Sequence, residues 1–152
     1  MQFLSRVIEK ECVYLNRTSD RLFSEAFTVE RARQLEADDD LSERLEAFTS
    51  RFSRLQDTLG DKLIPQLLLA LGEKQATVMD NLDKAERLGW IANADEWQAI
   101  RLLRNQMVHE YIDDLNILTS AIQSAQYFVP MLNEVANTLL TELEKRGWLD
   151  SD

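Results

Sequence analysis

The chain has 152 residues, of which 45% are hydrophobic and 29% charged, and 27 acidic against 17 basic residues give a net charge of −10. These values predict one soluble globular domain, residues 1–152, whose acidity opposes general attraction to nucleic acid. The single cysteine, Cys12, excludes an internal disulfide and a cysteine-based zinc site, and no apolar run is long enough to cross a membrane. A cytoplasmic, unexported protein is expected.

Apolar residues recur at helical spacing along the first half of the chain. A first helix is expected at 3–27, and a shorter one at 29–37. Three consecutive carboxylates, 38–40, predict the start of the next helix, because negative charge suits the positive end of the helix dipole. Gly60 and Pro65 predict a kink or a break in that helix. The apolar stripe of the first helix comprises Leu4, Ile8, Leu15, Leu22 and Ala26.

The second half of the chain contains three more predicted helices. The first spans residues 74–88, and Gly89 after it is expected to adopt the left-handed conformation that ends many helices. Asn93 is expected to cap the next helix. The last helix, 115–146, contains Pro130, which predicts a kink, and ends before a second such glycine, Gly147. These elements predict an all-α protein, an up-down bundle of four to five helices.

The segment "RNQMVHEY", residues 104–111, contains the only histidine of the chain, His109. Asn105 precedes His109 by four residues, so both share one helical face and can form a hydrogen bond. Arg104 precedes Tyr111 by seven residues, so these two share another stripe. An ordinary surface histidine near a helix end is the simplest alternative interpretation.

The pattern of Arg104, four residues, His109, one residue and Tyr111 resembles the R-x4-H-x-Y signature of HEPN-domain proteins, in particular the HepT-like toxins of HEPN/MNT pairs. Asn105 also fits, because a polar residue usually follows the arginine in that family. The resemblance extends to the whole chain, an all-α bundle in which the motif ends one helix and a long helix follows.

The resemblance implies a metal-independent endoribonuclease that acts as a homodimer, with no cofactor. Arg104 would bind the scissile phosphate and His109 would transfer protons, while Asn105 would complete the catalytic set. It also implies an MNT-type nucleotidyltransferase antitoxin as partner, which would add AMP to Tyr111. RNA is the expected substrate, and neither DNA nor a membrane is an expected partner.

Other charged residues are candidates for contacts with RNA or a metal ion. Four basic residues are weak candidates for RNA binding, although a solvated charged face is the favoured interpretation of the last three: Arg101, Arg44, Arg51 and Lys62. The carboxylates at 38–40 and 113–114 are interpreted as helix-start residues, and no metal site is predicted.

Three functions remain compatible with the sequence. The first is the endoribonuclease toxin of a HEPN/MNT pair. The second is a non-catalytic substrate-binding or accessory partner of a nucleotidyltransferase, which the net charge of −10 fits at least as well. The third is a purely structural helical dimer.

Overall fold

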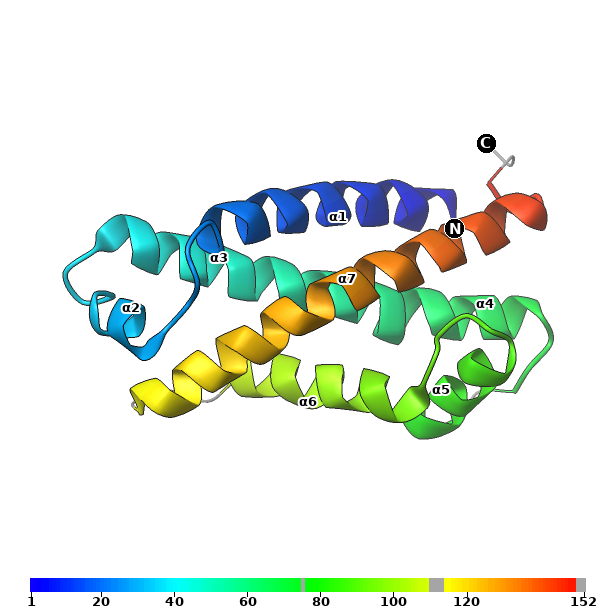
Figure 1. The fold of residues 1–152 in the computed structure, drawn as a ribbon. Helices are drawn as coiled ribbons and strands as arrows, with labels where there is room; N and C mark the ends of the chain where they lie inside the picture. The colour runs from blue at the N-terminus through cyan, green and yellow to red at the C-terminus, as the bar shows by residue number, and fades with distance from the viewer. Residues whose placement is uncertain (75, 110–113, 150–152) are drawn as a thin grey trace.

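The computed structural model describes residues 1–74, 76–109 and 114–149, without the side chains of Val108 and His109. All regular structure within these ranges is helical (Figure 1). The elements in chain order are α1 (Gln2–Leu22), α2 (Val29–Arg33), α3 (Asp39–Gln56), the π-helix η1 (Asp57–Leu63), α4 (Ile64–Ala70), α5 (Val78–Arg87), α6 (Ala94–His109) and α7 (Leu115–Lys145).

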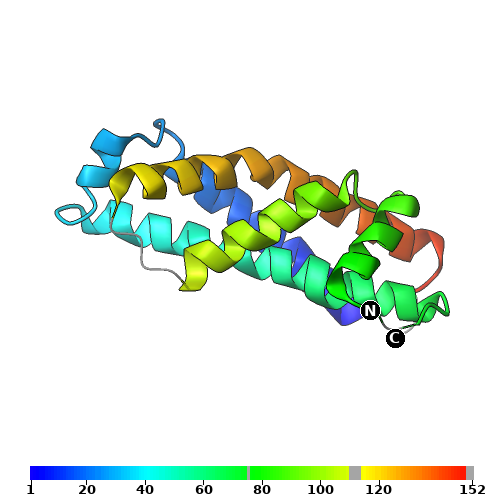
Figure 2. The ribbon, with the colours of Figure 1, turned by 90° about the horizontal axis from the view of Figure 1, so that it is seen from below.

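Four long rods make up the molecule: α1, the continuous run of α3, η1 and α4, then α6, and finally α7. Their directions alternate along the chain, and α7 crosses diagonally over the others (Figures 1 and 2). The short helices α2 and α5 lie at opposite ends of the bundle. The expected all-α bundle is therefore confirmed, and no helix among the described residues is long and apolar enough to cross a membrane.

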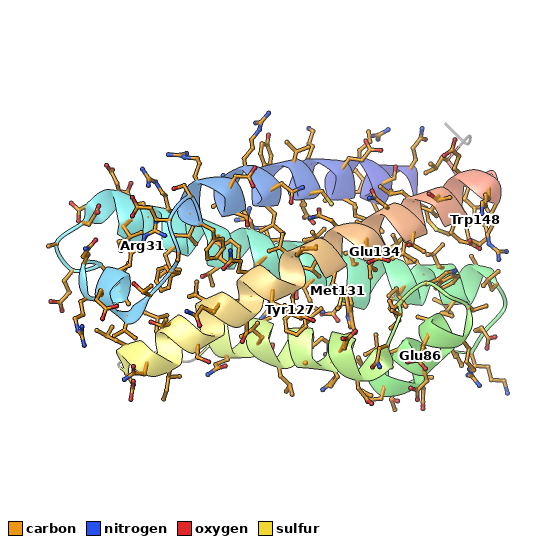
Figure 3. The ribbon with its side chains drawn as sticks, in the orientation of Figure 1. Arg31, Glu86, Tyr127, Met131, Glu134 and Trp148 are labelled. Carbon is orange, nitrogen blue, oxygen red and sulfur yellow. The ribbon has the colours of Figure 1, made fainter. Side chains whose placement is uncertain are left out.

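The first helix ends at Leu22, five residues earlier than expected. The guanidinium of Arg31, labelled in Figure 3, donates hydrogen bonds to the carbonyl oxygens of Leu22 and Glu25, and so satisfies groups that a longer helix would have paired internally. The chain turns here, so Phe27 is buried and Ala26 is exposed. The expected place of Ala26 in the apolar stripe was therefore wrong.

The rod from Asp39 to Ala70 continues through Gly60 and Pro65, where a kink or a break was expected. It does so by widening into the π-helix η1, a form that changes the hydrogen-bond register. Pro65 follows in the first turn of α4, where a missing N–H is tolerated. A Cβ atom on Gly60 would stand 2.7 Å from Nε1 of Trp97, so glycine permits the close approach of η1 and α6.

Side chains cap the predicted helix starts. Asp38 accepts a hydrogen bond from the backbone N–H of Leu41, and Asn93 accepts one from that of Glu96. The helix predicted from residue 74 begins only at Val78, because Thr77 supplies the cap. Likewise α2 ends at Arg33, and the residues expected to continue it to 37 form turns.

Glycine ends the two helices for which it was predicted. Gly89 and Gly147 have φ angles of 77° and 72°, and the N–H of the tryptophan after each donates to a carbonyl five residues back. Gly72 ends α4 in the same way, with φ of 84°, which was not predicted. The last helix, α7, passes through Pro130 as one element.

Every long rod contributes to one continuous core. Its largest fully buried side chains come from α1, the loop after it, the α3–α4 rod and α6. They are Ile8, Leu15, Leu22, Phe27, Phe48, Phe52, Leu55, Leu59, Leu63, Ile64, Leu67 and Trp97. The packing of α6 against the α3–η1 rod within this core brings the motif helix beside Asp57.

Candidate functional site

Arg104 is held by a carboxylate from the neighbouring rod. Its Nε and Nη2 atoms donate to Oδ1 and Oδ2 of Asp57 over 2.8 and 2.6 Å, a bidentate ion pair. The side chain of Arg104 is 20% exposed and that of Asp57 is 30% exposed. Asp57 is the first residue of η1, so the π-helical segment begins where the motif arginine binds.

A second ion pair lies beside the first. Nε of Arg101 is 3.7 Å from Oδ1 of Asp61, and both pairs join α6 to η1. Arg101 precedes Arg104 by three residues, which places the two arginines on one side of α6. Asp61 follows Asp57 by four, which places the two aspartates on one side of η1. Because the two helices run in opposite directions (Figure 1), the two ion pairs follow each other along the contact and form a short ladder of alternating charge.

The electrostatics of this ladder follow from its contacts. The hydrogen bonds from Arg104 to Asp57 raise the pKa of the guanidinium, and burial opposes that shift. Burial raises the pKa of the Asp61 carboxyl, with Arg101 acting against the shift and Asp57 adding to it. Arg104 is therefore a permanent cation, while Asp61 retains its proton to a higher pH than an ordinary aspartate.

The other motif residues are only partly described. Asn105 is exposed, and its Oδ1 accepts a hydrogen bond of 3.4 Å from Nη1 of Arg104. His109 is the last residue of α6, and its side chain lies outside the described atoms. Tyr111 lies outside the described residues. The hydrogen bond expected between Asn105 and His109, and the accessibility of Tyr111, therefore stay predictions.

The weaker RNA-binding candidates lie in different surroundings. The guanidinium of Arg51 donates to the carbonyl of Tyr14 and the hydroxyl of Thr18, and it stacks 5.4 Å from the Tyr14 ring centroid. It is thus directed toward α1. Lys62 is exposed and Arg44 is half-buried, while Arg101 belongs to the ladder with Asp61. Of these basic residues, the described contacts join only Arg101 to the surroundings of Arg104.

Asp57 and Asp61 were not predicted as site residues. Their spacing of four residues marks one helical side, but many carboxylates in this acidic chain have such spacing. Their relevance depends on a contact that spans 47 residues between Asp57 and Arg104. A carboxylate near the motif could have been sought in the sequence, yet nothing local distinguishes Asp57 from its neighbours.

A third carboxyl lies where α1 meets η1. Oε1 of Glu11 accepts a 3.1 Å hydrogen bond from the Thr58 hydroxyl, whereas Oε2 is buried without a hydrogen-bond partner in the described part of the chain. Burial raises the pKa of Glu11, and the Thr58 hydrogen bond opposes that shift. The adjacent Cys12 thiol has its pKa raised to about 11, chiefly by burial, so it stays protonated and weakly nucleophilic at neutral pH.

Comparisons with models of known families, with curated proteins and with solved structures give no match for this chain. Within the described residues, no group of three or more histidine, cysteine, aspartate or glutamate side chains is placed to hold a metal ion. The described arrangement is a fixed guanidinium, with an adjacent amide, on the helix that ends at the single histidine. A guanidinium and an amide can donate hydrogen bonds to an anion such as a phosphate, but Nε and Nη2 of Arg104 already donate to Asp57.

Proposed function

We propose that this protein is a metal-independent endoribonuclease of the HEPN type, the toxin of a toxin–antitoxin pair with an MNT-type nucleotidyltransferase. The observation that carries the proposal is the bidentate hydrogen bonding of Arg104 to Asp57. It fixes the orientation of the Arg104 guanidinium on α6, five residues before His109. A catalytic arginine gains from such preorganisation, because less conformational entropy is lost when the substrate binds.

The proposed reaction breaks RNA at the scissile phosphate. The imidazole of His109 accepts the proton of the 2′-hydroxyl, and the 2′-oxygen attacks the adjacent phosphorus. Arg104 binds the non-bridging oxygens, where negative charge increases in the transition state. The bond to the 5′-oxygen breaks, and a protonated imidazole of a second subunit donates its proton to that oxygen. The products are a 2′,3′-cyclic phosphate and a 5′-hydroxyl, so atoms and charge balance.

In this proposal the antitoxin controls the same site. Adding AMP to the hydroxyl of Tyr111 attaches a phosphate close to Arg104 in sequence. That phosphate would compete with RNA for the guanidinium and would add negative charge to the substrate cleft.

A second candidate function is a non-catalytic partner of a nucleotidyltransferase. It is favoured by the ladder, in which Arg101 and Arg104 are each paired with a carboxylate. Two arginines and two aspartates leave this surface without net positive charge, on a chain whose net charge is −10. RNA binding derives much of its affinity from phosphate contacts with unpaired cations, so a paired surface suits a protein ligand equally well.

An RNA cleavage assay separates the two functions. Purified protein is incubated with labelled RNA beside the variants His109→Ala and Arg104→Ala, with and without EDTA. We expect cleavage that persists in EDTA and falls by about 10²–10⁴-fold when His109 is replaced. Arg33→Ala is the matched control, because that arginine is exposed on α2 and pairs with the surface residue Glu30. Wild-type protein without cleavage, or variants as active as wild type, would contradict the endoribonuclease.

A further inference from the structure

The first 19 residues of α7 carry no charge. Residues 115–133 include no Asp, Glu, Lys or Arg over 19 positions, in a chain that is 29% charged. Composition alone would place about five charged residues there. Burial does not explain the absence, because eight of these positions are exposed: Asn116, Ile117, Ser120, Gln123, Ser124, Gln126, Tyr127 and Pro130.

The uncharged surface extends onto α6. Leu102 is 60% exposed, and Gln106 follows it one helical turn later. A groove of about 330 Å³ lies between α6 and α7. Gln106 lines its α6 side, and Ile117, Ser120 and Ser124 line its α7 side. Arg101 and Arg104 do not reach this groove, because both are paired with carboxylates of η1.

We call this surface the neutral face and define it by Leu102 and Gln106 of α6 with Ile117, Ser120, Ser124 and Tyr127 of α7. Two of its members are among the most exposed apolar side chains described, Tyr127 at 71% and Leu102 at 60%. Exposed apolar groups beside a groove of small residues are typical of a surface that another protein covers.

The spacing along α7 suits a second helix of the same sequence. Residues 117, 120, 124, 127 and 131 alternate intervals of three and four, which places them on one stripe. Ile117 and Met131 stand equally far from Ser124 on its two sides, and so do Ala121 and Tyr127. Figure 3 shows Tyr127 and Met131 following each other along α7.

From these observations we propose that the neutral face is the interface between two copies of this chain, with the two α7 helices antiparallel and the two-fold axis at Ser124. Ile117 of one copy then packs against Met131 of the other. Tyr127 packs against the small residues Ser120 and Ala121, which leave room for its ring. The small side chain of Ser124 permits close approach of the helices at the axis.

The net charge of the chain indicates which kind of partner binds the neutral face. Two copies with a net charge of −10 each repel one another over most of their surfaces. They approach at least cost where neither carries carboxylates. A basic partner protein would gain most from the acidic surfaces instead, so an uncharged face on an acidic chain favours self-association.

The inference assigns the interface of the dimer that the proposed function requires, and in that respect it rests on the proposed function. Gln106, in the neutral face, is two residues after Arg104 and three before His109. Docking at this face would therefore bring the second copy beside the motif helix.

Cysteine cross-linking tests the axis. In a Cys12→Ser background, Ser124→Cys should form an intermolecular disulfide under mild oxidation at micromolar concentration, because a residue on a two-fold axis meets its own copy. Ser42→Cys, exposed at the start of α3, is the control and should remain a monomer on a non-reducing gel. Equal cross-linking of the two variants, or none at Ser124, would overturn the proposed axis.

Sedimentation velocity tests the face without a cross-link. Wild type should sediment with twice the chain mass of 17.6 kDa. Tyr127→Glu should shift the protein to monomer, while Phe3→Glu should leave it dimeric, because Phe3 is similarly exposed at 68% but lies on α1. A monomeric wild type, or a dimer that persists in Tyr127→Glu, would refute this interface.

The outcomes also separate this inference from the proposed function. A protein that dimerises through the neutral face but cleaves no RNA would contradict the proposed endoribonuclease activity and support the proposed interface. A protein that cleaves RNA and stays dimeric in Tyr127→Glu would contradict the interface and support the endoribonuclease.

Discussion

The guanidinium of Arg104 and the carboxylate of Asp57 form a bidentate ion pair, with distances of 2.8 Å from Nε to Oδ1 and 2.6 Å from Nη2 to Oδ2. The pair joins two helices whose paired residues are 47 positions apart in sequence. A phosphate offers the same kind of double acceptor as a carboxylate. Asp57 therefore has two opposing effects on anion binding: it orients the guanidinium, and it offsets the positive charge.

We expect this pair to stabilise the fold measurably. In a double-mutant cycle with Arg104→Ala and Asp57→Ala, the coupling energy should be about 1 kcal/mol, the upper end for partly exposed ion pairs. The matched cycle uses Arg33 and Glu30, whose side chains are 63% and 77% exposed, and should give less. Chemical denaturation measures both. A coupling no larger than that of the surface pair would show that the contact is weak in solution.

Gly60→Ala should lower the free energy of unfolding by about 1–3 kcal/mol, although alanine is the better helix former. The added Cβ would stand 2.7 Å from Nε1 of Trp97, whose side chain is almost completely buried and has little room to move. Ser42→Ala, at an exposed helix position, is the control and should change stability little.

Trp97→Phe tests the cause of that loss. It removes the atom that the new Cβ would meet, so the double variant Gly60→Ala, Trp97→Phe should lose less stability than the two single variants added together. Strict additivity in urea denaturation would mean that the cost of the alanine arises elsewhere.

Glu11→Gln should make the protein more stable at neutral pH, and the gain should fade on acidification. Burial raises the pKa of Glu11 above its ordinary value of 4.5. A carboxyl whose pKa is raised on folding destabilises the fold fully above the folded pKa, and this effect is lost below the unfolded pKa. Urea midpoints measured at neutral pH and below 4.5 check this, with Glu9→Gln, exposed on the same helix, as control. A gain that is independent of pH would point to packing instead of charge.

Tyr111 should be the residue that the nucleotidyltransferase modifies, if the proposed toxin–antitoxin pair is correct. Incubation with the partner enzyme and ATP should add the mass of one or more AMP units, and modified protein should lose RNA cleavage. Tyr111→Phe should stay active and gain no mass. Tyr14→Phe, exposed on α1, is the control and should be modified like wild type. A mass increase in Tyr111→Phe would place the modification on another residue.

Local chemistry in the sequence was enough to predict most of the helices and several of their ends. Asp38 and Asn93 cap helices because a short polar side chain reaches the free N–H groups of the first turn. Gly89 and Gly147 end helices because they adopt positive φ without a steric penalty. The spacing of the motif could likewise be read directly from the sequence, whereas its chemical role is still a proposal.

Contacts between distant segments decided the rest. Arg31 binds the carbonyl of Leu22, the last residue of α1, from nine residues away, and Trp97 requires a glycine on the rod opposite. Asp57 lies beside Arg104 only because α6 packs, in the opposite direction, against the rod that contains α3 and η1. Helical periodicity determines which face of a helix a residue occupies, but the partner on that face depends on how the core packs. For that reason the sequence by itself identified the motif, and only the tertiary structure brought Asp57 to its arginine.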